Sequence, residues 1–229
     1  STLMRSSAAS DVYKRQILYP TSGEVLVNGF VPWERKNEFK RSFAIVMGQK
    51  NQLWWDLPAS DSLYLNKCIY DVDDREYKKT VDELSELLGV RELMNIQVRR
   101  LSLGERMKME ILAALIHRPG ILFLDEPTIG LDIVSQQKIR DFLHYYNEQT
   151  KTTIILTSHY MRDIEALCSR AVIINSGTLV YDGALSDINH RMGDKRLLTL
   201  SFSSPVETGK LSIFCLLYTS PSPRDRSVS

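Results

Sequence analysis

The sequence predicts an α/β fold with a parallel core sheet, and three observations support that prediction. Residues 42–48, 121–124 and 153–157 are apolar runs with the length of buried strands. Segments of helical length lie between these runs, and strands that alternate with helices are typical of a parallel sheet. Hydrophobic residues make up 43% and charged residues 25% of the 229 residues, a composition that favours a packed core over global disorder.

Turn residues delimit the remaining elements. Residues 23–30 alternate apolar and polar side chains around Asn28-Gly29, which predicts a half-exposed strand. A Ser-Gly turn between two apolar runs predicts a hairpin over residues 171–182. Helices are expected over residues 60–70, 74–88, 104–117, 135–149 and 161–168.

Bulk properties argue against several classes of protein. Lys and Arg nearly balance Asp and Glu, leaving a formal charge of +1, whereas a nucleic-acid binder usually has a basic excess. Cys68, Cys168 and Cys215 are far apart and form no CxxC pair, which favours a reducing cytoplasm over a disulfide or zinc framework. No stretch approaches the roughly 20 apolar residues of a membrane span, so a membrane function requires another chain.

The two ends differ in composition from the middle. Residues 1–16 include SSAASDVYKRQ, and the last residues include CLLYTSPSPRDRS, two stretches that resemble translated sequencing-adaptor sequence. The alternative is a pair of natural disordered tails. We therefore expect three regions: a foreign or disordered segment over residues 1–16, a domain over 17–206, and a foreign or disordered tail over 207–229.

The segment ILFLDEPTIGLD over residues 121–132 is the strongest functional signal. Four apolar residues predict a strand buried on both faces. Asp125 and Glu126 follow at its carboxyl end, the edge where α/β sheets bind ligands. An Asp there can hold Mg²⁺ through water, and a neighbouring Glu can accept a proton from an attacking water.

A second signal is LSLGERM, in which Ser102 and Glu105 form an S-x-x-E capping box at a predicted helix start. Isolated capping boxes are common and structural. A helix N-terminus with a serine hydroxyl, and with Gly104 permitting close approach, is also an anion site. The capping box lies upstream of Asp125. The two motifs in this order indicate a particular function more specifically than either motif alone.

Two further positions follow predicted strands. His159 ends IILTSH, and it can reach the same edge of the sheet and donate a hydrogen bond to a phosphate, although a histidine there is often structural. Gln49 follows the strand over residues 42–48, where a glutamine is more often an ordinary loop residue. The next segment, NQLWWDLP, places four apolar side chains either in the core or on a partner-contact surface: Leu53, Trp54, Trp55 and Leu57.

In this order, these elements resemble the nucleotide-binding domain of the ABC superfamily. The resemblance covers residues 17–183, and GQKNQLWWDLP and LSLGERM are similar to a bacterial exporter branch related to drug-resistance ATPases. The family's motifs correspond to the Q-loop at Gln49, the signature at residues 101–105, Walker B at Asp125-Glu126, the D-loop at Gly130-Leu131-Asp132 and the switch histidine at His159.

The resemblance implies a P-loop NTPase-type ABC ATPase domain, with a parallel core sheet and a helical subdomain. It implies a cytoplasmic subunit, peripheral on the inner face of the cell membrane, that binds ATP and Mg²⁺ and drives a separate integral membrane transporter subunit. Two nucleotide-binding domains, as a homodimer or a heterodimer, are expected to sandwich two nucleotides. No nucleic-acid partner is expected.

The same resemblance implies a role for each motif residue. Glu126, His159 and Gln49 are the expected catalytic group, acting on water, the γ-phosphate and the metal, and Asp125 and Gln49 are the expected metal contacts. Further nucleotide contacts are expected from the signature, which serves the opposite subunit, and from the D-loop: Ser102, Gly104, Glu105 and Asp132.

The sequence departs from the family pattern in two ways. Leu103 and Glu105 stand where the family favours Gly and Gln, so a negative charge faces an expected phosphate. No G-x-x-x-x-G-K-[ST] occurs in the chain, while ILYPTSGEVLVNG resembles the segment that follows the P-loop helix. We therefore expect an inactive fragment whose first P-loop strand and helix lie upstream.

The sequence is also compatible with two other functions. One is a non-transport ABC ATPase acting on ribosomes or DNA. Such proteins carry a second domain or long coiled coils, and neither feature occurs in this sequence, although truncation would hide a second domain. The other is a regulatory module that does not hydrolyse ATP, and the presence of Glu126 and His159 counts against it.

Overall fold

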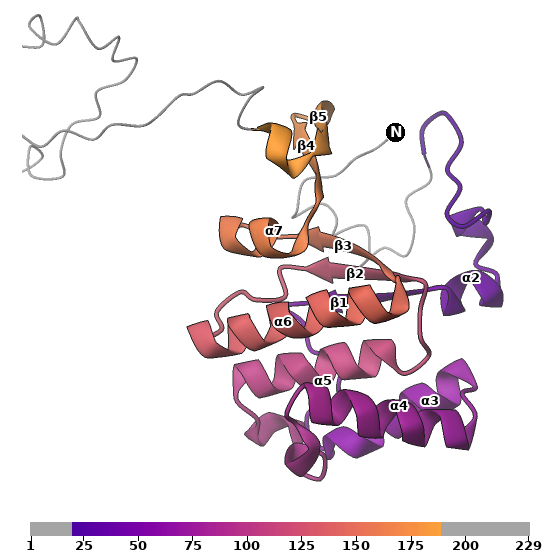
Figure 1. The fold of residues 1–229 in the computed structure, drawn as a ribbon. Helices are drawn as coiled ribbons and strands as arrows, with labels where there is room; N and C mark the ends of the chain where they lie inside the picture. The colour runs from indigo at the N-terminus through magenta and orange to yellow at the C-terminus, as the bar shows by residue number, and fades with distance from the viewer. Residues whose placement is uncertain (1–19, 189–229) are drawn as a thin grey trace, which may run out of the picture. The chain divides into compact units, whose positions relative to one another are not determined.

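The computed structural model describes residues 20–188, and its central feature is a parallel three-stranded sheet (Figure 1). The strands β1 (Phe43–Met47), β2 (Ile121–Asp125) and β3 (Thr153–Thr157) lie in the order β1-β2-β3. The register aligns Met47 with Asp125 and Asp125 with Thr157. The three carboxyl ends therefore meet at one edge of the sheet, as predicted.

The predicted helices form, with boundaries that differ by a residue or two. Asp73 accepts hydrogen bonds from the N–H groups of Arg75 and Glu76 at the start of one helix, and Gly89, with φ 64°, follows its end. The α-helices are α2 (Asn37–Arg41), α3 (Ala59–Tyr70), α4 (Asp74–Leu87), α5 (Leu103–Leu115), α6 (Ile133–Thr150) and α7 (Met161–Leu167). Short 3-10 helices are Pro32–Glu34, Arg91–Leu93, Val98–Arg100 and Leu185–Asp187.

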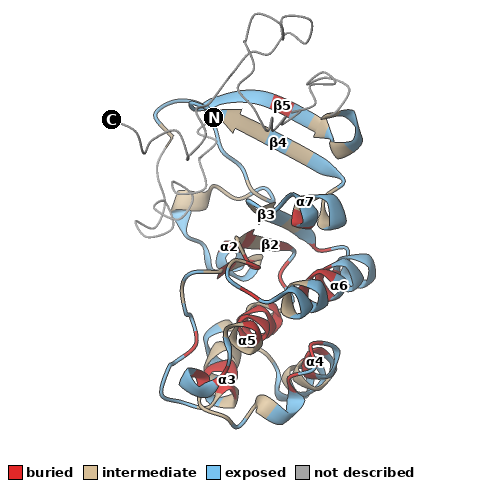
Figure 2. Ribbon diagram, turned by 90° about the vertical axis from the view of Figure 1, so that its left-hand side faces the viewer, coloured by how far each residue is buried: buried red, intermediate tan, exposed pale blue. Residues whose placement is uncertain are grey.

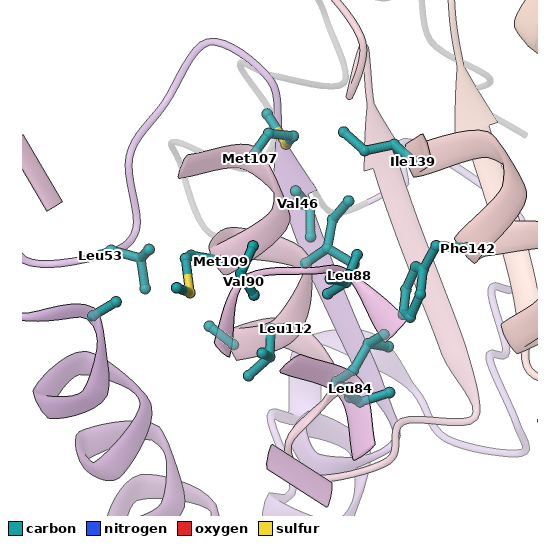
Figure 3. Close-up of a cluster of buried hydrophobic side chains, with 14 of the residues drawn as sticks. Val46, Leu53, Leu84, Leu88, Val90, Met107, Met109, Leu112, Ile139 and Phe142 are labelled. Atoms are coloured by element: carbon teal, nitrogen blue, oxygen red, sulfur yellow. The ribbon is translucent and has the colours of Figure 1, made fainter. Parts of the chain in front are cut away.

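Helix α5 lies at the centre of the hydrophobic core. It packs against β1, α3, α4 and α6, and it is the most continuously buried helix in Figure 2. Met109 and Leu112 of α5 have no exposed surface, and Figure 3 shows them among side chains from several elements, including Val46 of β1 and Phe142 of α6. The core therefore joins the sheet to the helices α3 and α4, which lie beyond α5 (Figure 1).

The two faces of the sheet are buried to different degrees. Alternate residues of β1 and β2, such as Val46 and Leu124, point into the core and are about 1% exposed. On the other face Phe123 is half-buried and Ile155 is 46% exposed. The expectation that β2 is buried on both faces is therefore only partly met within residues 20–188.

The predicted strand over residues 23–30 is wrong. Only an isolated bridge joins Val27 to Phe30 across a turn in which Asn28 and Gly29 have φ values of 50° and 78°. The alternation was misleading because a strand needs a neighbour to satisfy its backbone groups, and this segment pairs with none in the described part of the chain.

The predicted hairpin does form, from β4 (Arg170–Asn175) and β5 (Thr178–Ala184), which pair antiparallel. Its two turn residues, Ser176 and Gly177, have φ values of 48° and 78°. Positive φ at both positions is the requirement of a type I′ turn, whose twist matches that of a hairpin.

Several sequence-based expectations lie outside the described residues. They are the proposed tails over 1–16 and 207–229, Cys215 and the end of the expected domain. Within that range, no helix is both long enough and apolar enough to cross a membrane.

Candidate functional site

The carboxyl edge of the sheet gathers the acidic pair beside the strand that leads to His159. Asp125 ends β2 and lies opposite Thr157, whose hydroxyl donates a hydrogen bond to Asp125 Oδ1 over 2.6 Å. The backbone N–H of Glu126 donates to the carbonyl of Thr157 over 3.0 Å. Thr157 at the end of β3 therefore holds the carboxylate of Asp125 and the backbone of Glu126.

Glu126 and His159 form a direct side-chain contact. Glu126 Oε1 lies 2.6 Å from His159 Nε2, and the side chain of Glu126 is 13% exposed, while that of His159 is 67% exposed. Glu126 has a left-handed backbone conformation with φ 50°, which is uncommon for a residue other than glycine. The chain turns sharply at Glu126. The contact between Glu126 and His159 is consistent with the sequence-based expectation that His159 reaches the edge of the sheet at Asp125 and Glu126.

Gly48 brings the end of β1 against the same turn. Its N–H donates to the carbonyl of Asp125 over 2.8 Å. A Cβ at this position would overlap the carbonyl oxygen of Glu126, so only glycine permits this approach. Gln49 directly follows Gly48, and this position places it at the same edge as Asp125 and Glu126. It is exposed.

The predicted capping box at the start of α5 is present. Ser102 Oγ accepts a hydrogen bond from the N–H of Glu105 over 3.3 Å. Glu105 Oε2 accepts from the N–H and the hydroxyl of Ser102 over 2.9 Å and 2.8 Å. These hydrogen bonds, the backbone one first, lower the pKa of Glu105. The carboxylate that replaces the family's glutamine is therefore turned back onto its own helix N-terminus.

Gly104 lies against the start of α6. A Cβ there would overlap the hydroxyl of Ser135, so the signature turn and the D-loop can approach only because residue 104 is glycine. Asp132 caps α6: its carboxylate accepts from the N–H of Ser135 over 2.8 Å and from its hydroxyl over 2.6 Å. These two bonds, the hydroxyl one first, lower the pKa of Asp132.

The site residues predicted from the sequence therefore form two groups. Asp125, Glu126, His159 and Gln49 gather at the edge of the sheet, whereas Ser102, Gly104, Glu105 and Asp132 gather where α5 and α6 begin. In the range 20–188, no hydrogen bond or ion pair links the carboxylates of Asp125 and Glu126 to the signature turn.

Sequence reasoning missed a buried polar cluster behind the acidic edge. Asp163 of α7 has no exposed surface and contacts Thr128, Arg140 and Ser158. Thr128 was visible within DEPT, and Ser158 within TSH. Nothing in the local pattern indicated that Asp163 is buried, because a burial of this kind depends on a partner from another helix.

The tryptophan segment divides between the two roles considered for it. Leu53 is 4% exposed and belongs to the core, whereas Trp54 and Trp55 are 57% and 44% exposed. The guanidinium of Arg106 lies 5.1 Å from the Trp55 ring centroid. Glu110 of α5 accepts hydrogen bonds from the N–H groups of the segment, over 2.8 Å from Gln52 and 3.2 Å from Leu53.

The acidic edge suits a magnesium ion that arrives with a phosphate ligand. The described residues contain no group of three or more His, Cys, Asp and Glu side chains that could hold a metal ion. Mg²⁺ usually keeps several waters and takes one or two protein carboxylates together with substrate phosphates. The donors at the end of β2, Asp125 with Glu126 beside it, fit that requirement.

Comparison with known proteins agrees with these motifs. The model of the family described as ABC transporter matches residues 14–129. The ABC transporter ATP-binding protein NatA of Bacillus subtilis is 35% identical over 75% of this chain and 70% of its own length. The linearmycin resistance ATP-binding protein LnrL of the same organism is 32% identical over 86% of this chain and 63% of its own length.

A solved structure shows the same fold. It is cbiO1 from Clostridium perfringens, described as part of the ABC transporter complex cbiONQ, with a TM-score of 0.69 and 24% identity over 80% of this chain and 74% of that one. The family model, the relatives and the motif geometry lead to one conclusion: the chain belongs to the ABC transporter family, as an ATP-binding protein.

Proposed function

We propose that this chain is part of a subunit that couples hydrolysis of Mg²⁺–ATP to transport by a separate membrane subunit. The observation that carries the proposal is the 2.6 Å contact between Glu126 and His159 beside Asp125 at the carboxyl edge of the sheet. Phosphoryl transfer depends mainly on positioning and on charge stabilisation, and this edge supplies both kinds of group.

The roles of these residues follow from their chemistry. Glu126 accepts a proton from the attacking water as the water oxygen bonds to the γ-phosphorus and ADP departs. His159, which donates to Glu126 when Nε2 carries a proton, is exposed enough to meet the γ-phosphate. Asp125 and Gln49 would contact Mg²⁺, which when bound neutralises the phosphate charge.

The separation of the two groups of residues supports a site shared between two copies or two related subunits. The signature turn, residues 101–105, lies at the capped N-terminus of α5, whereas Asp125 lies at the end of β2. We infer that Ser102 and Gly104 contact the nucleotide held by the opposite subunit, with Glu105 and Asp132 holding the turn in place.

A membrane-bound partner is the remaining part of the proposal. The solved structure cbiO1, which has the same fold, is described as part of an ABC transporter complex. The exposed Trp54 and Trp55 offer an apolar surface for such a partner. We infer that the protein lies at the inner face of the cell membrane.

The decisive experiment replaces Glu126 in a P-loop-complete chain, defined as this chain extended at its N-terminus by an added segment that carries G-x-x-x-x-G-K-[ST]. Glu126→Gln keeps the shape of the side chain but removes its basicity. We expect ATP turnover to fall at least about a hundredfold, the lower end of what a positioned acid–base group contributes. Binding of Mg²⁺–ATP should persist.

The matched control is Glu148→Gln. Glu148 also lies near a histidine, with its Oε2 3.7 Å from His144 Nδ1, but both side chains are exposed on α6. Its turnover should equal that of the unmodified P-loop-complete chain. Equal turnover for Glu126→Gln would remove Glu126 from the proposed role, and absence of turnover in the unmodified P-loop-complete chain would refute the proposed activity.

A further inference from the structure

A buried acidic residue links the two chain segments that carry Glu126 and His159. Asp163, in the first turn of α7, has no exposed surface. Its Oδ2 accepts hydrogen bonds from the hydroxyls of Thr128 and, over 3.1 Å, Ser158. Its Oδ1 accepts from Arg140 Nη1 of α6 over 2.7 Å. One carboxylate therefore joins three separate segments.

Two of these segments begin or end at the acidic edge. Thr128 lies two residues after Glu126, and its side chain is almost completely buried. Gln136 of α6 supports the same loop, because its Nε2 donates to the carbonyl of Leu131 over 3.1 Å. The loop that starts at Glu126 is consequently held from α6 and from α7.

The segment that carries His159 is held on the other side. Ser158 precedes His159 and donates to Asp163, while Ser158 Oγ also accepts from the N–H of Tyr160 over 3.0 Å. The residues on both sides of His159 are thus fixed through Ser158. The imidazole itself remains 67% exposed and is restrained by Glu126.

We propose that Asp163, with Arg140 as its counter-ion, is a positioning residue that holds Glu126 and His159 in register for hydrolysis. The proposal rests on the proposed function. A buried ion pair is weak evidence for stability, because well-packed apolar side chains often replace such a pair without loss. The acceptors that Asp163 offers to Thr128 and Ser158 have no apolar substitute, and they connect directly to the two site segments.

The ion pair and the positioning contacts can be separated experimentally. Removing Asp163 alone would leave Arg140 charged and buried, with 8% side-chain exposure, and would destabilise the chain. The double variant Arg140→Met with Asp163→Leu removes both charges and keeps the volume apolar. Because well-packed apolar side chains often replace a buried ion pair without loss, we expect the fold to be preserved. The variant still removes the acceptor of Thr128 and Ser158, so the positioning contacts are lost.

A single substitution gives a second, milder variant with a matched control. Thr128→Val deletes the hydroxyl that donates to Asp163. Thr152→Val makes the same change in another buried threonine, 5% exposed, whose hydroxyl donates to the carbonyl of Pro119 over 3.3 Å at the opposite end of β3. Both variants lose a buried hydrogen bond, and Thr152→Val also loses the bond that Thr152 Oγ1 accepts from the hydroxyl of Thr150 over 2.9 Å. Only Thr128 lies at the acidic edge.

The first measurement is steady-state hydrolysis of Mg²⁺–ATP by the P-loop-complete chain. For the double variant and for Thr128→Val we expect kcat to fall by about tenfold to a hundredfold, the range in which small misplacements of reacting groups act. The KM for ATP should stay within about twofold, because an interaction used only in the transition state lowers kcat and kcat/KM together. Thr152→Val should leave kcat unchanged.

The second measurement needs no activity and uses the chain as it stands. Amide hydrogen exchange should become faster over residues 126–131 and 158–160 in both site variants, while the amides of β2 keep their protection. Unchanged exchange there in variants that melt like the unmodified chain would overturn the proposal, as would an unchanged kcat. Lack of turnover in the unmodified P-loop-complete chain refutes the proposed function instead, and the exchange data still decide the role of Asp163.

Discussion

At the scale of single residues, two glycines allow the site to assemble. The end of β1 reaches the turn at Glu126 because Gly48 has no Cβ, and the signature turn reaches Ser135 because Gly104 has none. The sequence suggested that Gly104 permits close approach to an anion. The structure shows that the same absence of a side chain is already needed within the chain, for contact with α6.

Glu110 is a second residue whose role depends on its surroundings. It is 4% exposed, and burial raises the pKa of its carboxyl above the ordinary value of 4.5, although hydrogen bonds from the N–H groups of Gln52 and Leu53 oppose this rise. A buried carboxyl that remains protonated to higher pH in the folded chain links stability to pH.

The sign of that linkage gives a prediction for Glu110→Gln. From pH 4.5 up to the raised pKa, the folded chain retains a proton that the unfolded chain has lost, so the free energy of unfolding falls as pH rises. The amide oxygen of Gln can still accept from Gln52 and Leu53 but does not titrate. The variant should therefore gain stability relative to the unmodified chain as pH rises, by about 1.4 kcal/mol for each pKa unit between the folded and unfolded states.

Urea unfolding from about pH 4.5 to about pH 8 measures this difference. The exposed Glu83→Gln, also in the helical part of the chain, serves as the control and should show no such trend. A stability difference between Glu110→Gln and the unmodified chain that stays constant over the whole pH range would contradict the interpretation.

At the scale of elements, α5 connects two parts of the proposed machinery. Its first turn forms the signature and contacts Ser135, while Glu110, two turns later, holds Gln52 and Leu53. The ring of Trp55 lies beside Arg106 of the same helix. A displacement of the tryptophan segment by a partner would therefore act on α5 directly, since this helix is rigidly packed in the core.

Replacing Trp54 tests whether this segment is a docking surface. The Trp54 side chain is 57% exposed, so Trp54→Ala should leave the melting temperature and the basal ATPase of the P-loop-complete chain nearly intact. The substitution should weaken association with the membrane subunit and thereby uncouple transport. The measurements are thermal unfolding, ATP turnover, and the fraction of protein that sediments with the membranes of its host.

Leu53→Ala provides the contrast in the same segment. Leu53 is 4% exposed in the core, and truncating a buried leucine costs about 2–5 kcal/mol, so its melting temperature should fall clearly. If Trp54→Ala lowers the melting temperature as much, Trp54 contributes to packing, and the docking interpretation is wrong.

At the scale of the whole molecule, the chain has the acidic edge and the signature turn but no P-loop motif. A P-loop surrounds the β- and γ-phosphates with backbone N–H groups and a lysine. Asp125 and Glu126 are anionic and repel a triphosphate that carries no magnesium. The sheet face that includes Ile155, which is 46% exposed, also remains partly uncovered among the described residues, and exposed apolar surface favours aggregation.

We therefore expect this chain not to bind Mg²⁺–ATP tightly. Isothermal titration calorimetry should detect no micromolar affinity, whereas the P-loop-complete chain should bind the nucleotide and hydrolyse it when dimeric. Replacing the P-loop lysine in that chain should return the affinity to the level of the present chain. Micromolar binding by the present chain would show that the assignment of the phosphate site is wrong.

From residue 43 to residue 184, the sequence by itself determined the order of the strands and α-helices and the positions of the candidate site residues along them. Short apolar runs separated by helical segments were sufficient for β1, β2 and β3, because local periodicity reflects burial. Asp125, Glu126 and His159 could be assigned to one edge, because parallel strands bring their carboxyl ends together. The caps at Ser102 and Asp132 were equally local, since each side chain bonds to its own first helical turn.

Only the tertiary structure decided which residues support that site. Asp163 is buried because Arg140, Thr128 and Ser158 approach it from three segments, and no local pattern encodes such a meeting. The tryptophan segment and residues 23–30 show the same limit, since their alternation and apolar character are compatible with several environments. Burial of a polar group and pairing of a strand depend on distant partners, and a single sequence read locally does not contain the position of those partners.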